Sequence, residues 1–136
     1  MPFVADPSFA AASFPPDEAN DVASAAARRP AIEPAWAPHL FRYELRNLLF
    51  VAHLRKRIDA AELAEQWELA EKFAIRYPES DDGAATIALA LKHKLTSYDA
   101  AYLALARARG LDLASNDKRL IAAARREGVK TITALI

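Results

Sequence analysis

The chain contains no cysteine, which excludes disulfide bonds, zinc–thiolate sites and thiol nucleophiles. Its three glycines are isolated in the sequence, so there is no glycine-rich loop of the kind that cradles phosphates. Net charge is absent too, because 18 basic residues balance 18 acidic ones. No global field therefore attracts nucleic acid, and only a local basic patch could do so. No apolar run approaches the roughly 20 residues of a membrane span.

The remaining composition is that of an ordinary globular protein. The chain has 136 residues, of which 53% are hydrophobic and 26% charged, and this length suits one domain with one core. We therefore expect a single domain over residues 1–136. The opening residues 1–6 have neither a basic flank nor a long apolar run, so they do not form a secretory signal. We expect a cytoplasmic protein with no membrane segment.

Short strand-like runs alternate with helical runs, which predicts an α/β domain with a mostly parallel sheet. Extended segments are expected at 2–6, 31–34, 74–77, 111–115 and 129–133. Helices are expected at 17–29, 38–57, 60–73, 80–94, 96–109 and 117–127. Pro38 is suited to the first turn of its helix, and Asp59 is expected to cap the helix that follows it.

Four acidic residues stand next to apolar segments on four separate predicted elements. A carboxylate that leaves water is costly unless it is paired or bound to a cation. Two of the four follow predicted strands, and in a parallel sheet the carboxyl ends of strands are where ligands bind. The pattern predicts a shared divalent metal ion held by Asp6, Glu44, Asp99 and Asp117.

Each acid also has a structural explanation. Asp6 precedes a proline and could start a turn. Asp117 could be a first-turn acid of its helix, with Asn116 or Ser115 as the cap. For Asp99, three residues after Thr96, the spacing is that of a capping box, and by spacing alone this explanation is the stronger one.

Glu44 has the weakest structural explanation. Its neighbours four residues away on either side are Leu40 and Leu48, and no cation shares its side of the helix. An acid that faces the core without a cationic partner is unusual. A functional role is therefore favoured for Glu44.

Basic and histidine residues give weaker signals. Most basic clusters flank helix ends, which favours a role in helix stability and solubility, yet Arg55, Lys56 and Lys118 are candidates for contacts with backbone phosphates of RNA. The three histidines lack metal-ligand spacing and are expected at the surface: His39, His53 and His93.

The chain resembles the PIN-domain family, and within it the VapC-type ribonuclease toxins of bacterial toxin–antitoxin pairs. The resemblance is carried by four segments, of which the third is the most specific: Val4–Ser8, Tyr43–Leu49, Thr96–Ala106 and Leu113–Leu120. It implies a three-layer α/β/α sandwich with the four acids at one edge. It also places Asn47 and Ser115 at positions that support the site, and Pro7 where a smaller residue is commoner.

The resemblance implies a metal-dependent endoribonuclease that uses Mg²⁺ or Mn²⁺, forms a homodimer and is inhibited by a cognate antitoxin. Its RNA substrate could be tRNA or another structured RNA. The apolar stretch of helices 38–57 and 60–73 is expected to bind an antitoxin helix. Two alternatives stay open: a catalytically silent PIN-like module that binds RNA or protein, and a metal-dependent hydrolase of other phosphate esters.

Overall fold

The structure is a computed structural model that describes residues 2–12 and 35–133. The helix expected at 17–29 and the extended segment expected at 31–34 lie outside these residues. No helix in the described part of the chain is long and apolar enough to cross a membrane.

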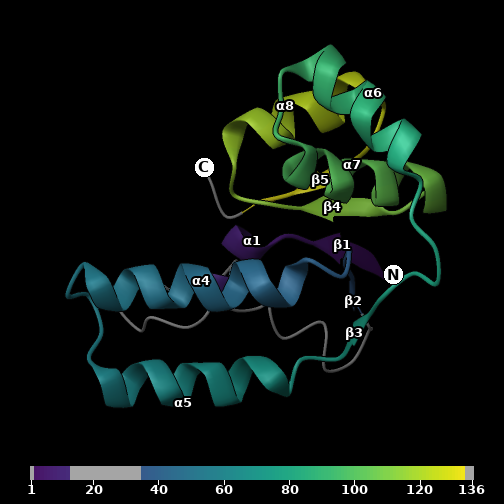
Figure 1. The fold of residues 1–136 in the computed structure, drawn as a ribbon. Coiled ribbons are helices and arrows are strands. Elements are labelled where there is room, and N and C mark those ends of the chain that lie inside the picture. Colours follow the sequence, from purple (N-terminus) through teal and green to yellow (C-terminus); the bar gives the residue numbers. More distant parts are fainter. Residues whose placement is uncertain (1, 13–34, 134–136) are drawn as a thin grey trace.

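A five-stranded parallel sheet forms the centre of the domain (Figure 1). Its spatial order is β3-β2-β1-β4-β5, and every pairing among the described strands is parallel. The strand β2 was not predicted at its position, because two residues are too few to show an alternating pattern. The strands are β1 Phe3–Ala5, β2 Ala35–Trp36, β3 Ile75–Arg76, β4 Asp112–Ala114 and β5 Thr131–Ile132.

Six helices are described, and five of them were predicted. They are α1 Pro7–Ala11, α4 Phe41–Leu54, α5 Ala60–Glu71, α6 Gly83–His93, α7 Ser97–Arg109 and α8 Lys118–Arg126. The exception is α1, where Pro7 occupies the first turn and follows the cap Asp6; a missing backbone donor costs nothing at that position. The cap at Asp59 is confirmed, as part of a capping box.

The start predicted for the long helix is wrong. Pro38 lies before α4 rather than in its first turn, and its carbonyl accepts a hydrogen bond from the Phe41 N–H at 3.0 Å. This bond closes a turn that precedes the helix. The cap of α4 is Leu40, which makes no side-chain capping bond.

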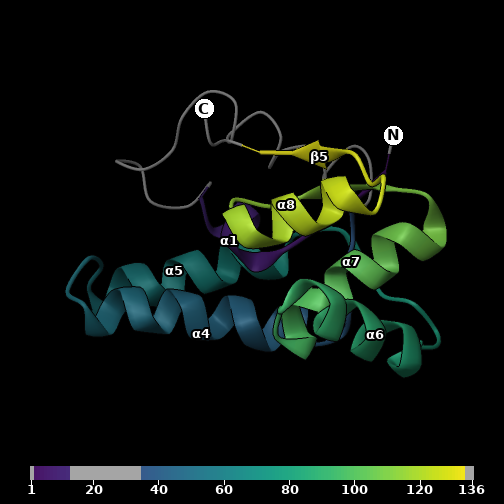
Figure 2. The same ribbon diagram turned by 90° about the horizontal axis from the view of Figure 1, so that it is seen from above.

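Successive side chains of the central strands point to opposite faces of the sheet, so the buried residues form one cluster on each face. Val4 and Leu113 belong to one cluster with buried residues of α4, α5, α6, α7 and α8, and Figure 2 shows these helices on the same side of the sheet. Phe3, Ala5 and Ala114 belong to a second cluster with Phe9 of α1. The expected α/β fold, a parallel sheet flanked by helices, is confirmed.

The topology brings the ends of β1 and β4 together. The two strands are neighbours, with Ala5 opposite Ala114, and the Asp6 N–H continues the ladder by donating to the Ala114 carbonyl at 3.0 Å. The residues after both strands, Asp6 on one and Ser115 to Asp117 on the other, therefore meet at the carboxyl edge of the sheet, as expected for a parallel sheet.

Candidate functional site

The four acids predicted to share a site line one cavity of about 410 Å³. Asp6 follows β1, Glu44 comes from α4, Asp99 from the first turn of α7, and Asp117 precedes α8. The other residues that line this acidic pocket are Pro7, Ser8, Asn47, Leu48, Val51, Ala52, Arg55 and Arg57.

Asp6 is the most firmly held of the four. Its Oδ1 accepts hydrogen bonds from the Phe9 N–H at 3.0 Å and the Ser8 hydroxyl at 2.7 Å, and its Oδ2 accepts one from the Ser115 hydroxyl at 2.5 Å. The residue is only 5% exposed. Burial raises the pKa of Asp6, the three hydrogen bonds oppose that rise, and the nearby Asp117 carboxylate adds to it.

Asp117 caps α8 with its own side chain, since its Oδ1 accepts from the N–H groups of Arg119 at 2.9 Å and Leu120 at 3.2 Å. The explanation that made Asp117 a first-turn acid capped by Asn116 or Ser115 is therefore wrong. Ser115 instead links two of the acids: its hydroxyl donates to Asp6 and accepts from the Asp117 N–H at 3.0 Å.

Glu44 does not face the core, contrary to the sequence-based expectation. The buried positions of α4 are Phe41, Leu45 and Leu49, and Glu44 lies one residue away from this stripe, on the side that lines the pocket. Leu48 shares that side and is 38% exposed. Partial burial raises the pKa of Glu44, a hydrogen bond from Tyr102 lowers it, and the carboxylates of Asp99 and Asp6 raise it further.

Asp99 combines a helix-end position with a place in the pocket. Its backbone N–H donates to the Thr96 hydroxyl at 3.1 Å, which is one of the two bonds of the predicted capping box, while the residue also lines the acidic pocket. Burial is the largest cause of its raised pKa and Asp117 the second, against the lowering effects of Thr96 and Arg119. Asp6, Glu44 and Asp99 thus have raised pKa values, first because burial disfavours their charged forms and then because other carboxylates lie nearby.

Sequence reasoning missed Tyr102, which is the buried anchor of Glu44. The residue is 1% exposed, and its hydroxyl donates to Glu44 Oε1 at 2.6 Å. Burial raises the pKa of Tyr102 far above its usual value, and Glu44 raises it further, so the phenol remains a hydrogen-bond donor. A buried tyrosine hydroxyl needs a polar partner, and this requirement was the available signal in the sequence.

The predicted basic residues fall into two groups. Arg55 lines the acidic pocket, as does Arg57, which was not singled out. Lys56 and Lys118 are exposed and do not belong to the residues lining the pocket. Lys118 is nevertheless the first residue of α8, directly after Asp117.

The expected surface position of the histidines is wrong for His93. Its side chain is 3% exposed and contacts Glu127 Oε2 at 2.7 Å. The Glu127 side chain also binds Lys92 at 2.8 Å and Arg107 at 2.9 Å. This cluster joins the ends of α6, α7 and α8, a contact that the sequence pattern does not reveal. His39 is exposed, and His53 is half-buried.

The donor set of the acidic pocket suits a hard divalent cation. Carboxylate oxygens are the ligands that Mg²⁺ and Mn²⁺ prefer. Among the residues that the structure describes, no group of three or more His, Cys, Asp or Glu converges closely enough to hold an ion. A cation in this pocket would therefore be held by one or two carboxylates and otherwise hydrated, which is the usual way Mg²⁺ is bound.

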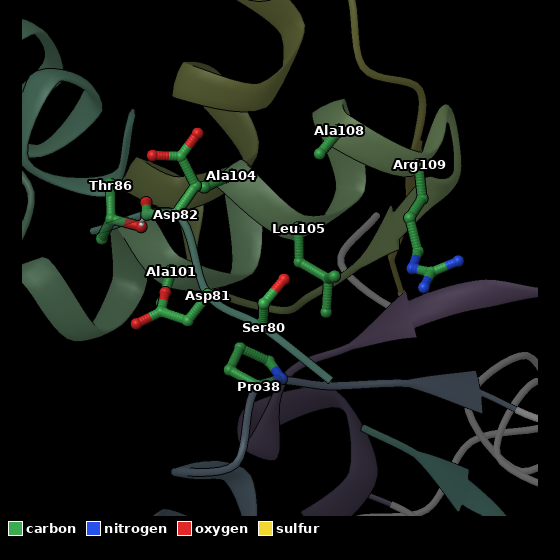
Figure 3. A pocket seen from close by; sticks show the side chains of 10 residues that line it. All are labelled: Pro38, Ser80, Asp81, Asp82, Thr86, Ala101, Ala104, Leu105, Ala108 and Arg109. Carbon is green, nitrogen blue, oxygen red and sulfur yellow. Dashed lines mark hydrogen bonds between the residues drawn. The ribbon is translucent and has the colours of Figure 1, made fainter. Parts of the chain in front are cut away.

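A second cavity of about 460 Å³ lies between α7 and the segment before α6 (Figure 3). Two of its charged groups have structural roles. Asp82 caps α6 by accepting from the Ala85 N–H at 3.0 Å, and the Arg109 guanidinium lies 3.6 Å from the centre of the Trp36 ring. The acidic pocket is thus the better candidate for chemistry.

Comparison with known proteins agrees with the α/β fold. A family model described as PIN domain matches residues 4–133. The fold is similar to that in the crystal structure of PAE2754 from Pyrobaculum aerophilum, with a TM-score of 0.74 and 22% sequence identity over 97% of this chain and 90% of that chain. At this identity the likeness shows the fold alone. No match is found among curated proteins.

Proposed function

The chain belongs to the PIN-domain family, whose members are generally metal-dependent nucleases, and on this premise we propose that it is a metal-dependent endoribonuclease of the VapC toxin type. The observation that carries the proposal is the meeting of Asp6, Glu44, Asp99 and Asp117, from four separate elements, in one pocket. A structural role explains the capping bonds of individual acids, but it does not explain why all four line the same cavity.

The proposal assigns different roles to the four acids. Asp6 and Asp99 would hold the cation, Mg²⁺ or Mn²⁺, and Glu44 and Asp117 would orient the attacking water. When bound, the cation supplies Lewis acidity and neutralises charge on the scissile phosphate. The water oxygen would form a bond to phosphorus while a carboxylate takes its proton, and the bond to the leaving sugar oxygen would break as that oxygen takes a proton from solvent. The raised pKa of Glu44 suits it to accept that proton.

Neighbouring residues keep the acids in place and bind the RNA. Ser115 and Ser8 donate to Asp6, and the Asn47 amide lies in the same pocket. Arg55 at the pocket wall contacts the RNA backbone, with Lys56 and Lys118 as further phosphate contacts outside the pocket. These contacts supply a local basic field that the neutral chain lacks as a whole.

The toxin assignment includes two protein partners, a second copy of the chain and a cognate antitoxin. Exposed apolar side chains on the α4–α5 hairpin support an antitoxin surface there: Tyr43, Phe50, Leu54 and Leu69. An apolar face of this kind suits an amphipathic helix. An antitoxin arginine that enters the acidic pocket would pair with its carboxylates and block it.

Cleavage of a mixed pool of tRNA and structured RNA tests the proposal. Antitoxin-free protein is incubated with the pool in Mg²⁺, Mn²⁺ or EDTA, beside the Asp99→Asn variant. We expect cuts at few positions that require both metal and Asp99. No cutting by folded protein would favour an RNA- or protein-binding module, and hydrolysis of small phosphate esters without RNA cleavage would favour a different hydrolase.

A further inference from the structure

Gln66 occupies a buried position of α5 that the helix pattern assigns to an apolar residue. It lies four residues before Ala70, and these two are the buried residues of the helix. Gln66 is only 7% exposed, and its Oε1 atom accepts no hydrogen bond from any residue that the structure describes. A buried acceptor without a donor costs free energy that an apolar side chain would not. Such an atom calls for a partner from outside the chain, which is either water or a ligand.

Gln66 lines a cavity of about 510 Å³ between α1, α4 and α5, which we call the Gln66 cavity. Helices α1 and α5 both pack on α4 (Figures 1 and 2). The lining includes apolar side chains of α4 and of the segment after it, among them Leu49 and Ile58. Two polar residues of the lining bind each other, since the Asn116 N–H donates to the Ser8 hydroxyl at 3.1 Å. Gln66 Oε1 thus remains as an acceptor for a ligand.

The Gln66 cavity and the acidic pocket share a wall. Four residues line both: Ser8, Leu48, Ala52 and Arg57. The two spaces are close, because the Ser8 hydroxyl also donates to Asp6 Oδ1 at 2.7 Å. The proposed function puts the scissile phosphate at the acidic pocket. Only one ribose separates a phosphate from its base in RNA, so the base of an adjacent nucleotide reaches the neighbouring cavity.

We propose that the Gln66 cavity binds one nucleobase of the RNA beside the scissile phosphate, and that Gln66 Oε1 accepts a hydrogen bond from an N–H on the edge of that base. This inference rests on the RNA substrate of the proposed function. A nucleobase combines a flat ring that packs on apolar side chains with N–H donors at its edge, and proteins read unstacked single-stranded bases through both features. Gln66 then selects the base next to the cut.

The carboxamide of Gln66 can turn toward such a base at little cost. The last torsion of a glutamine side chain has only broad, shallow preferences, and Oε1 gives up no hydrogen bond to a described residue when it moves. A phosphate group is a poor ligand for Oε1, because its oxygens are themselves acceptors. A single water molecule takes up about 30 Å³, which is a small part of the cavity of about 510 Å³. Size and chemistry therefore favour a base over both.

Base preference in cleavage is the first test. Short RNAs that vary one nucleotide at a time around the cut are incubated with the full chain and Mn²⁺, and kcat/KM is measured for each. We expect one base to be favoured at one position beside the cut by at least about 10-fold, the discrimination that a well-placed base contact supplies. In Gln66→Met, which has a side chain of similar length without the acceptor, the preference should fall to near parity.

A matched control lies on the same helix. Ala64→Met introduces the same residue at an exposed position of α5 and should retain the base preference. Thermal unfolding followed by circular dichroism checks both variants. Gln66→Met should leave the Tm of the free protein unchanged or raise it, because it removes a buried acceptor without a partner. A large fall in Tm would show that Oε1 has a structural partner and would overturn the proposal.

A binding measurement without cleavage separates the base site from the nuclease assignment. Gln66 is the only glutamine of the chain, so cell-free synthesis with glutamine labelled at Nε2 gives a protein with one labelled side-chain amide. Its NMR signals are followed as each of the four ribonucleoside 5′-monophosphates is added, and ribose 5-phosphate is the probe that lacks a base. We expect the nucleotide of the favoured base to shift the signals with saturation, and ribose 5-phosphate to leave them unchanged.

The failure of the base site and the failure of the proposed function give different results. Cleavage without a base preference, a preference that Gln66→Met retains, or an NMR shift that is absent or equal for ribose 5-phosphate would overturn the base site and leave the endoribonuclease assignment standing. A base-selective shift of the Gln66 signals in protein that cuts no RNA would support the base site and reject the endoribonuclease.

Discussion

Removal of the Tyr102 hydroxyl tests how the acidic pocket keeps its shape. The Tyr102→Phe variant retains the buried ring but loses the donor that holds Glu44 Oε1 at 2.6 Å. A hydrogen bond to a charged group contributes about 1.5–3 kcal/mol, but Glu44 is half-buried and can bond to water instead. We therefore expect a stability loss of only about 1 kcal/mol, or about 3–5 °C in Tm.

The functional effect of Tyr102→Phe is expected to be larger than the effect on stability. Residues that orient metal ligands or water-positioning carboxylates typically change activity or metal affinity 10- to 100-fold when removed. We expect the rate of RNA cleavage to fall about 10-fold. If Glu44 acts on water, the Mn²⁺ dissociation constant, measured by electron paramagnetic resonance, should rise less than this or not at all. Tyr98→Phe, on the same helix at 63% exposure, is the control with no expected effect.

A double-mutant cycle tests whether Tyr102 affects cleavage through Glu44. If Tyr102 acts through Glu44, then Tyr102→Phe adds no further loss of cleavage in a Glu44→Gln background, because the group that it orients is already disabled. Losses that simply add would refute this reasoning and assign Tyr102 a packing role. Cleavage by Tyr102→Phe at the wild-type rate would likewise show that the bond does not matter for activity.

Three further predictions concern single charged groups. Because the pKa of Asp99 in the folded state is raised above 3.8, the folded state binds more protons than the unfolded state above that pH, and the free energy of unfolding falls as pH rises through this window. Asp99→Asn should therefore raise the Tm of metal-free protein by a few degrees. An unchanged or lower Tm in thermal unfolding would contradict this prediction. The pKa of Glu127 is lowered to about 2, chiefly by Lys92 and then by His93. The contribution of Glu127 to stability is therefore present above about pH 4.5 and is lost as the pH falls toward 2. Glu127→Gln should lower the Tm by about 5 °C at pH 7 and by little at pH 2. Arg55→Ala should weaken RNA binding and reduce by about one the slope of the logarithm of the binding constant against the logarithm of the salt concentration. Fluorescence anisotropy with Asp99→Asn protein at several salt concentrations measures this slope. An unchanged slope would show that Arg55 does not contact the RNA.

Local sequence signals located most of the secondary structure. Asp59 with Glu62, and Thr96 with Asp99, are short-range patterns whose capping bonds form within one turn, so the starts of α5 and α7 could be predicted without tertiary information. The start of α4 was misplaced because Pro38 suits both a first helical turn and the turn that precedes a helix. The two residues of β2 form a strand only because β1 and β3 lie on either side of them.

The meeting of the four acids in one pocket was predicted from the sequence, but the contacts that hold them in place were not. Asp6 and Asp117 were placed at strand ends by the α/β pattern, but their contact through Ser115 requires β1 and β4 to be neighbours, although Asp6 and Ser115 are 109 positions apart in the sequence. The bond between Tyr102 and Glu44 likewise joins α7 to α4 across 58 residues. No periodicity within a single segment carries information about such contacts.

The sequence by itself determined the α/β alternation, the caps of α5 and α7 and the identity of four acids beside apolar segments, because each of these depends on neighbours within a few residues. Only the tertiary structure decided which way Glu44 faces, that His93 is buried against Glu127, and that the Ile87 and Leu91 side of α6 remains exposed. These outcomes depend on which elements pack together, and burial of a side chain is set by its neighbours in space rather than along the chain.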